Sequence, residues 1–166
     1  MGNENNIEIE RKFLIAYPDE AMLASLADAR VSDIVQTYLL SNEGERRVRM
    51  WKENGKVTYI STYKQKTGGL RRIEIEKEIT REAYEALLET ANPEMHPLHQ
   101  RRYTNPYGTH TAEIDIYPFW NDRAVLEIEL SREDEAFDFP DFVTVIREVT
   151  GEKQYKNPVL ARKYGG

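Results

Sequence analysis

The sequence predicts a mostly β protein with flanking helices, of the α+β class, whose antiparallel strands form a closed or nearly closed barrel with a charged interior. The first observation is that charged and apolar residues alternate with period two in six segments, which is the spacing of one strand face. The second is that these charges repeat with one sign, as Glu-x-Glu three times and Arg-x-Arg once. The third is that Asn, Gly and Pro separate the segments and mark turns.

Strands are expected wherever this alternation or a β-rich run holds. The pair Asn54-Gly55 predicts a tight hairpin turn, and the segment 106–108 predicts another turn. The apolar residues of each strand face outward in this arrangement, toward covering helices. The expected strands span residues 7–13, 32–40, 46–51, 57–66, 70–79, 99–105, 109–117 and 124–131.

Two covering helices are predicted from local signals, namely a capping residue followed by helix-forming residues. Segment 20–29 is rich in Ala and Leu and follows Asp19, and segment 81–91 carries an apolar stripe and follows Thr80. Further along, Ser131 and the acidic residues after it resemble another helix start. Segment 142–149 is a further amphipathic stretch, and a helical turn is expected within 152–163.

Length and composition restrict the class of protein. The 166 residues suit a single domain, 1–166, and a net charge of −6 argues against nucleic acid as a partner. The sequence contains no apolar run of the roughly 20 residues that cross a bilayer, and its polar N-terminus is not a secretory signal. With no cysteine, disulfides and Cys-bound zinc are excluded. We therefore expect a cytoplasmic protein without a membrane partner, and its oligomeric state stays open.

The charged strand faces carry both signs. A solvated face is the ordinary explanation for one such strand, but like charges on one strand, and on its neighbours, repel one another. Buried ion pairs alone explain them poorly, because burying each ion costs several kcal/mol. The acids are Glu8, Glu10, Glu74, Glu76, Glu113, Asp115, Glu127 and Glu129, and the bases are Lys12, Arg47, Arg49, Lys64, Arg72 and Arg102.

A divalent metal bound together with a chain of phosphates explains both signs at once. Carboxylates bind hard cations such as Mg²⁺ or Mn²⁺, and guanidinium and ammonium groups bind phosphate oxygens. Other chemistries find less support. The three histidines share no strand face, no Gly-rich phosphate loop is present, and glycoside hydrolysis would leave the arginines without a role.

These residues also resemble a known family. The segment 8–14, EIERKFL, is similar to the ExExK signature of the CYTH domain, whose members are also called triphosphate tunnel metalloenzymes. The charged residues that follow keep the family's order, and segment 149–157 resembles the C-terminal part of small bacterial members. The likeness extends over 8–161. It implies an eight-stranded antiparallel barrel that forms a tunnel for a triphosphate and for Mg²⁺ or Mn²⁺.

The resemblance also implies roles for individual residues. Tyr38 and Lys64 match a Tyr–Lys pair of some members, so these two and Lys12 are the catalytic candidates, although Tyr38 is equally explained as a wall residue. Gln100 stands where the family commonly has a second base, which weakens the expected phosphate grip there. The implied phosphate-binding residues are Lys12, Arg47, Arg49, Lys64, Arg72 and Arg102; the metal ligands are Glu8, Glu10, Glu127 and Glu129; and the further metal- or water-orienting residues are Glu74, Glu76 and Asp115.

The implied function is metal-dependent hydrolysis of a triphosphate. Inorganic triphosphate is the expected substrate, because the sequence contains no evident motif for reading a base. One metal would neutralise charge on the phosphate oxygens, and a second metal or a glutamate would activate water for in-line attack. The alternatives are a class IV-type adenylate cyclase, a thiamine or nucleoside triphosphatase, and a non-catalytic polyphosphate-binding module.

Overall fold

The computed structural model describes residues 6–68 and 71–164, which form nine strands and four short helices. The strands are β1 (Asn6–Ala16), β2 (Arg30–Leu39), β3 (Glu45–Glu53), β4 (Lys56–Gly68), β5 (Arg71–Ile79), β6 (Leu98–Tyr107), β7 (His110–Ile116), β8 (Arg123–Glu129) and β9 (Val145–Glu148). The helices are α1 (Glu20–Ser25), α2 (Arg81–Leu88), the 3₁₀ helix η1 (Lys153–Tyr155) and α3 (Asn157–Lys163). Position 70, the first residue of a predicted strand, lies outside the described residues.

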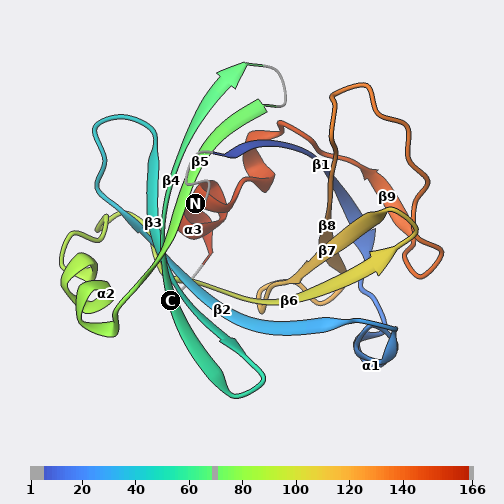
Figure 1. Cartoon of the computed structure of the whole chain (residues 1–166), viewed down its shortest axis with the longest axis horizontal. Coiled ribbons are helices and arrows are strands. Elements are labelled where there is room, and N and C mark those ends of the chain that lie inside the picture. Colours follow the sequence, from blue (N-terminus) through green and yellow to red (C-terminus); the bar gives the residue numbers. More distant parts are fainter. Residues whose placement is uncertain (1–5, 69–70, 165–166) are drawn as a thin grey trace.

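The strands form one antiparallel sheet in the order β5-β4-β3-β2-β6-β7-β8-β1-β9. An additional pairing of β5 with β1 closes the first eight strands into a barrel, which confirms the predicted fold class (Figure 1). This seam is short and runs from Asn6↔Glu74 to Ile9↔Arg71. Strand β9 pairs with β1 beyond the seam, so β1 contacts three strands, β5, β8 and β9.

Local signals predicted several of these elements correctly. Asn54 (φ +52°) and Gly55 (φ +77°) form the tight turn between β3 and β4, with the two positive φ angles of a type I′ hairpin. Asp19 accepts a hydrogen bond from the Met22 backbone at 3.2 Å and caps α1. Thr80 caps α2 in the same way. Both helices end three or four residues before the predicted boundary.

The outer barrel face is apolar, as predicted, but helices cover only part of it. Leu23 of α1 packs on outward residues of β1, β6, β7 and β8, and Tyr84 of α2 packs on β2 and β3. The predicted helix start at Ser131 is wrong. Segment 131–144 is irregular, and it places Phe137 and Phe139 against Phe13 with ring centroids 6.0 and 4.8 Å apart. Ring contacts of the half-buried Phe137 and the exposed Phe139 with Phe13 therefore take the place of the expected helix, and Pro140, which lacks a backbone N–H, follows them.

Two further boundaries differ from the prediction. The amphipathic stretch 142–149 contains the ninth strand, which the Arg11–Glu148 ion pair of 2.6 Å joins to β1. Strand β6 continues through Tyr107, so the β6–β7 turn begins at Gly108 (φ +54°) rather than at Pro106. Within the described residues, no helix is long and apolar enough to cross a membrane.

Helix α3 lies inside the outline of the barrel in Figure 1. The inward row of β1 changes there from Lys12 to Leu14, and the inward row of β8 changes from Glu127 to Val125. Leu14 and Val125 pack in one cluster with Leu160 of α3. The charged interior therefore has an apolar floor, to which this C-terminal helix contributes Leu160 and Ala161.

Candidate functional site

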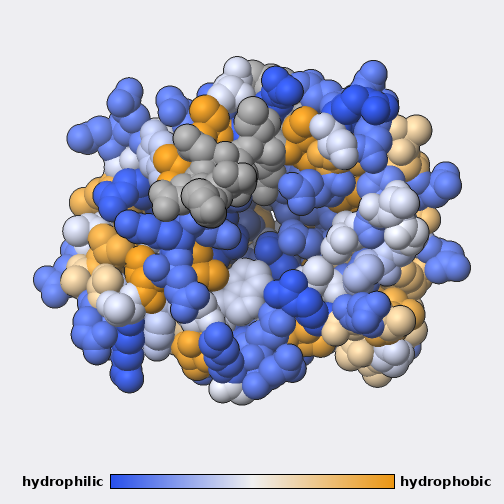
Figure 2. Space-filling model, in the orientation of Figure 1, coloured by the Kyte–Doolittle hydropathy of each residue, from blue (hydrophilic) through white to orange (hydrophobic). Residues whose placement is uncertain are grey.

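The molecule is hollowed at its centre, and the hollow is lined mostly by hydrophilic residues (Figure 2). The first cavity has a volume of about 730 Å³ and an adjoining second cavity one of about 230 Å³. The two form one continuous space, because they share Glu10, Arg47, Lys64, Glu127 and Asn157 in their linings. We call this space the tunnel.

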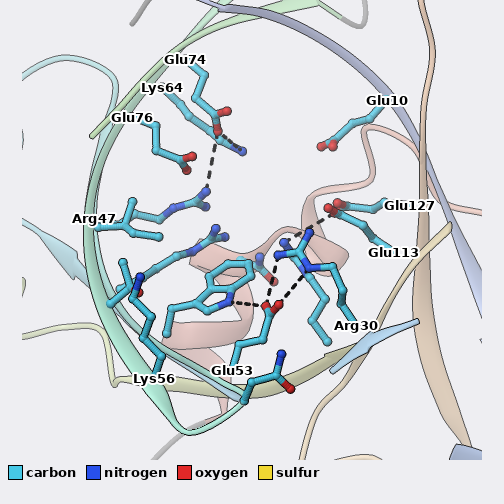
Figure 3. Close-up of a pocket in the computed structure, with 17 residues that line it drawn as sticks. Glu10, Arg30, Arg47, Glu53, Lys56, Lys64, Glu74, Glu76, Glu113 and Glu127 are labelled. Carbon is cyan, nitrogen blue, oxygen red and sulfur yellow. Dashed lines mark hydrogen bonds and ion pairs between the residues drawn. The ribbon is translucent and has the colours of Figure 1, made fainter. Parts of the chain in front are cut away.

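The bases of the tunnel gather on one wall, together with two carboxylates, and the facing wall carries further carboxylates (Figure 3). Strands β3 and β4 contribute the bases Arg47, Arg49 and Lys64, and β5 adds Glu74 and Glu76 beside them. Across the space, β1, β7 and β8 contribute carboxylates, namely Glu10, Glu113 and Glu127. An anion can therefore lie along the basic wall while a cation lies between that anion and the acidic wall.

Register places like charges opposite one another on the acidic wall. Glu10 lies opposite Glu129 in the β1–β8 pairing, and Glu113 lies opposite Glu127 in the β7–β8 pairing. Directly opposed like charges destabilise a sheet. Glu129 is exposed, so it lies at the margin of the tunnel rather than within it. A bound divalent cation would remove this repulsion.

Nearby bases decide the charge of these carboxylates. Burial raises the pKa of Glu127, but Lys12, whose Nζ lies 3.5 Å away, and Arg102 outweigh burial and lower it. Arg102 also lowers the pKa of Glu113, yet burial and the neighbouring carboxylates of Glu127 and Asp115 raise it overall. The acidic wall thus contains one carboxylate with a lowered pKa, Glu127, and one with a raised pKa, Glu113.

The basic wall contains two buried arginines with unmatched donors. Arg47 lies 3.6 Å from Glu45 and 3.9 Å from Glu74, and it is 4% exposed. Arg49 is 5% exposed, and burial followed by the charges of Arg47 and Arg102 lowers its pKa to about 10. Within the described part of the chain, the Nε atoms of both arginines have no hydrogen-bond partner. Unmatched buried donors beside a cavity fit an anion with several oxygens.

Arg102 is held in a fixed orientation by Asp115. Its Nε donates to Asp115 Oδ1 at 2.8 Å and its Nη2 donates to Oδ2 at 3.0 Å, which is a bidentate pair. The remaining Nη1 lies 3.5 Å from Glu113, and Trp51 lies 5.8 Å from the guanidinium carbon. Both carboxylate oxygens of Asp115 accept from Arg102 in this pair, which fixes the direction of the guanidinium.

Lys64 and Tyr38, the expected catalytic pair, both line the second cavity. Lys64 Nζ lies 3.4 Å from Glu74, and the Tyr38 hydroxyl donates to Gln36 Oε1 at 3.4 Å. Burial raises the pKa of Tyr38, so its phenol keeps its proton at neutral pH. The Tyr38 hydroxyl is therefore uncharged and donates to Gln36.

The structure does not bring every expected residue to the same place. Lys12 and Arg72 line only the second cavity, and the Glu8 side chain lies outside the described residues, although its backbone pairs with Arg72. Gln100 is buried and accepts a hydrogen bond from Gln36, so a layer of neutral amides occupies the position of the second base.

Sequence reasoning missed several residues that line the first cavity. Glu113 was counted among the acids of the charged strand faces but was assigned no role, and it lines the first cavity. Glu53 accepts hydrogen bonds from Arg30 at 2.9 Å, Ser32 at 2.7 Å and Trp51 at 3.1 Å, and this network forms one rim of the cavity. The sequence gives no local indication of the Arg30–Glu53 pair, because the pairing of β2 with β3 is what brings these two residues together.

The donor set fits a hard divalent cation without a preformed cage. Within 6–68 and 71–164, no group of three or more His, Asp or Glu side chains is gathered closely enough to hold a metal. Mg²⁺ in particular is bound through one or two carboxylates, waters and substrate phosphates. Glu10 and Glu127, with Glu129 at the margin, offer carboxylate oxygens of this kind across from the basic wall.

Comparison with known proteins agrees with this geometry. The CYTH domain model matches residues 6–158. Among solved structures, the chain is similar to the inorganic triphosphatase NE1496, at 26% identity and a TM-score of 0.58, covering 100% of this chain and 99% of that one. It also shares its fold with the PH1819 protein from Pyrococcus horikoshii OT3, at 20% identity and a TM-score of 0.59, covering 76% of this chain and 80% of that one. A search of curated proteins finds no match.

Proposed function

Because the chain belongs to the CYTH family, we propose that it is a divalent-metal-dependent triphosphatase that cleaves inorganic triphosphate to pyrophosphate and phosphate. The observation that carries the proposal is the basic wall facing an acidic wall across one tunnel. The likeness to NE1496, which is called an inorganic triphosphatase, supports this choice of substrate.

The basic side chains bind the phosphate chain. Arg47, Arg49 and Lys64 neutralise the phosphate oxygens along one wall, and the chain supplies the missing partners of the two buried Nε atoms. Arg102 approaches from β6, already oriented by Asp115. Lys12 and Arg72 bind the end of the triphosphate that reaches the second cavity.

The carboxylates hold the metal, and we propose Mg²⁺ or Mn²⁺ on Glu10, Glu127 and Glu129, with Glu8 contributing from the same strand as Glu10. Members of the family generally depend on a divalent metal. When bound, the metal neutralises charge on the phosphate oxygens and lowers the pKa of a coordinated water. Glu74 and Glu76 orient water from the β5 side.

Hydrolysis follows from these positions. Water attacks the terminal phosphorus in line, the bond to the bridging oxygen breaks, and pyrophosphate leaves. A carboxylate of the acidic wall accepts the proton from water. Lys12 and Lys64 stabilise the negative charge that grows on the leaving oxygen, and the protonated Tyr38 hydroxyl, which donates to Gln36 in the structure, turns to donate to the phosphate chain.

A substrate panel tests this function. Phosphate and cyclic nucleotide are measured with inorganic triphosphate, ATP, thiamine triphosphate and long polyphosphate, each with and without Mg²⁺ or Mn²⁺. We expect kcat/KM for triphosphate to exceed that for ATP by at least about tenfold, which is about 1.4 kcal/mol, and no cyclic AMP. Cyclic AMP at a comparable rate would identify a cyclase instead, and binding without turnover would identify a polyphosphate-binding module.

A further inference from the structure

The second cavity contains basic residues beyond those assigned to the triphosphate. Lys66 lies near the end of β4 and Lys156 lies directly before α3, and both line this cavity together with Lys12 and Arg72. Lys66 is also directly opposite Arg72 in the β4–β5 register. The fold therefore gathers four cations from four separate segments of the chain.

The charge balance differs between the two cavities. Among the described residues that line the first cavity, six bases face six carboxylates; the bases are Arg30, Arg47, Arg49, Lys56, Lys64 and Arg102, and the acids are Glu10, Glu53, Glu74, Glu76, Glu113 and Glu127. For the second cavity, the same comparison gives six bases and three carboxylates; the bases are Lys12, Arg47, Lys64, Lys66, Arg72 and Lys156, and the acids are Glu10, Glu45 and Glu127.

This surplus of positive charge acts on Lys156. Its contact with Lys66 is the largest influence, followed by burial and by the charges of Lys66, Arg72 and Lys12, and together they lower its pKa to about 8. Like charges held this close repel one another, and an anion placed among them removes the repulsion. Because few carboxylates are present, that anion needs no metal of its own to be accommodated.

We propose that Lys66 and Lys156 form a subsite for a fourth phosphate, so that the tunnel binds linear inorganic polyphosphates longer than triphosphate. The inference rests on the proposed function, because the first three phosphates occupy the residues assigned there. Continuity supports it: Arg47 and Lys64 line both cavities, so a phosphate chain can pass from one to the other. The ammonium groups suit a terminal phosphate, which carries more charge than an internal one.

The test compares affinities for triphosphate and tetraphosphate. Calorimetry is performed with Ca²⁺ in place of Mg²⁺, and phosphate release is measured in the same samples to confirm that the ligands stay intact. The variants are Lys66→Gln, Lys156→Gln and their combination. The matched controls are Lys77→Gln, on the outward face of β5, and Lys163→Gln, which is exposed on α3. Melting temperatures verify that all variants fold.

We expect the double variant to bind tetraphosphate at least about tenfold more weakly and triphosphate within about twofold of the wild-type protein. Equal losses for both ligands would place the lysines in the triphosphate grip, and unchanged affinity for both would remove them from the tunnel; either result overturns the subsite. Orthophosphate is titrated as well. If only orthophosphate binding is lost, the lysines hold free phosphate and the inference is wrong. If the wild-type protein binds neither chain, the proposed function itself fails.

Discussion

Replacing Arg49 by methionine separates the stability of the barrel from its phosphate binding. Burial and the charges of Arg47 and Arg102 lower the pKa of Arg49 from the usual value of a guanidinium to about 10. A base whose folded-state pKa is depressed has its charged form disfavoured by folding. The shift corresponds to a penalty of about 3 kcal/mol, which is fully present at pH 7 and is lost only as the pH rises above about 10.

Methionine keeps much of the side-chain volume while it removes the charge and the unmatched Nε. The guanidinium also lies 6.0 Å from the Trp51 ring, and loss of this contact offsets part of the gain. We therefore expect Arg49→Met to raise the free energy of unfolding by about 1–3 kcal/mol at pH 7. Triphosphate affinity should fall by about 2–5 kcal/mol, the usual cost of removing one partner of a buried charged contact.

Urea unfolding at pH 7 measures the first effect, and calorimetry with triphosphate and Ca²⁺ measures the second. Arg46→Met is the matched control, because Arg46 is on the same strand with the opposite parity and should change neither quantity by more than about 0.5 kcal/mol. A fall in the free energy of unfolding would mean that the buried charge of Arg49 does not destabilise the fold. Unchanged affinity would place Arg49 outside the phosphate site.

Three other changes probe the acids. Glu10→Gln should abolish metal-dependent phosphate release without lowering the melting temperature, because it removes one of two opposed like charges; near-normal turnover at saturating Mg²⁺ would refute its role as a ligand. Asp115→Asn should cost about 3–5 kcal/mol in urea unfolding, since it leaves Arg102 buried without its counter-charge, and a loss below about 1 kcal/mol would contradict this. The Arg30 guanidinium holds the pKa of Glu53 at about 2, so the stability from this pair is complete above pH 4.5 and is lost as the pH falls toward 2. Arg30→Met should flatten the fall in melting temperature between pH 4.5 and 2, and coincident profiles would disprove the link.

The interior of the barrel was predictable because strand parity is a local property. Arg47 and Arg49 must share a face whenever β3 is a strand, and the alternation in β8 places Glu127 inside for the same reason. The Asn54-Gly55 turn was predictable because few residues adopt two successive positive φ angles.

Pairing between charges was not predictable, since it depends on register across strands that are distant in sequence. Arg102 meets Asp115 bidentately and approaches Glu113 only at 3.5 Å, and nothing in the spacing of the two acids distinguishes them. The ninth strand escaped prediction for another reason. It is four residues long, largely exposed, and joined to Arg11 by an ion pair rather than by an apolar face.

The three partners of β1 bear on how the protein folds. Strands β2 to β5 form one meander and β6 to β8 another, and each can pair between neighbours in the chain. Strand β1 precedes both, yet it pairs with β5, β8 and β9, so these contacts require closure of long loops. During synthesis β1 must wait for β5 and then for β8. The wall that carries Glu10 is consequently completed late, and the tunnel gains its acidic side only when the ring is closed.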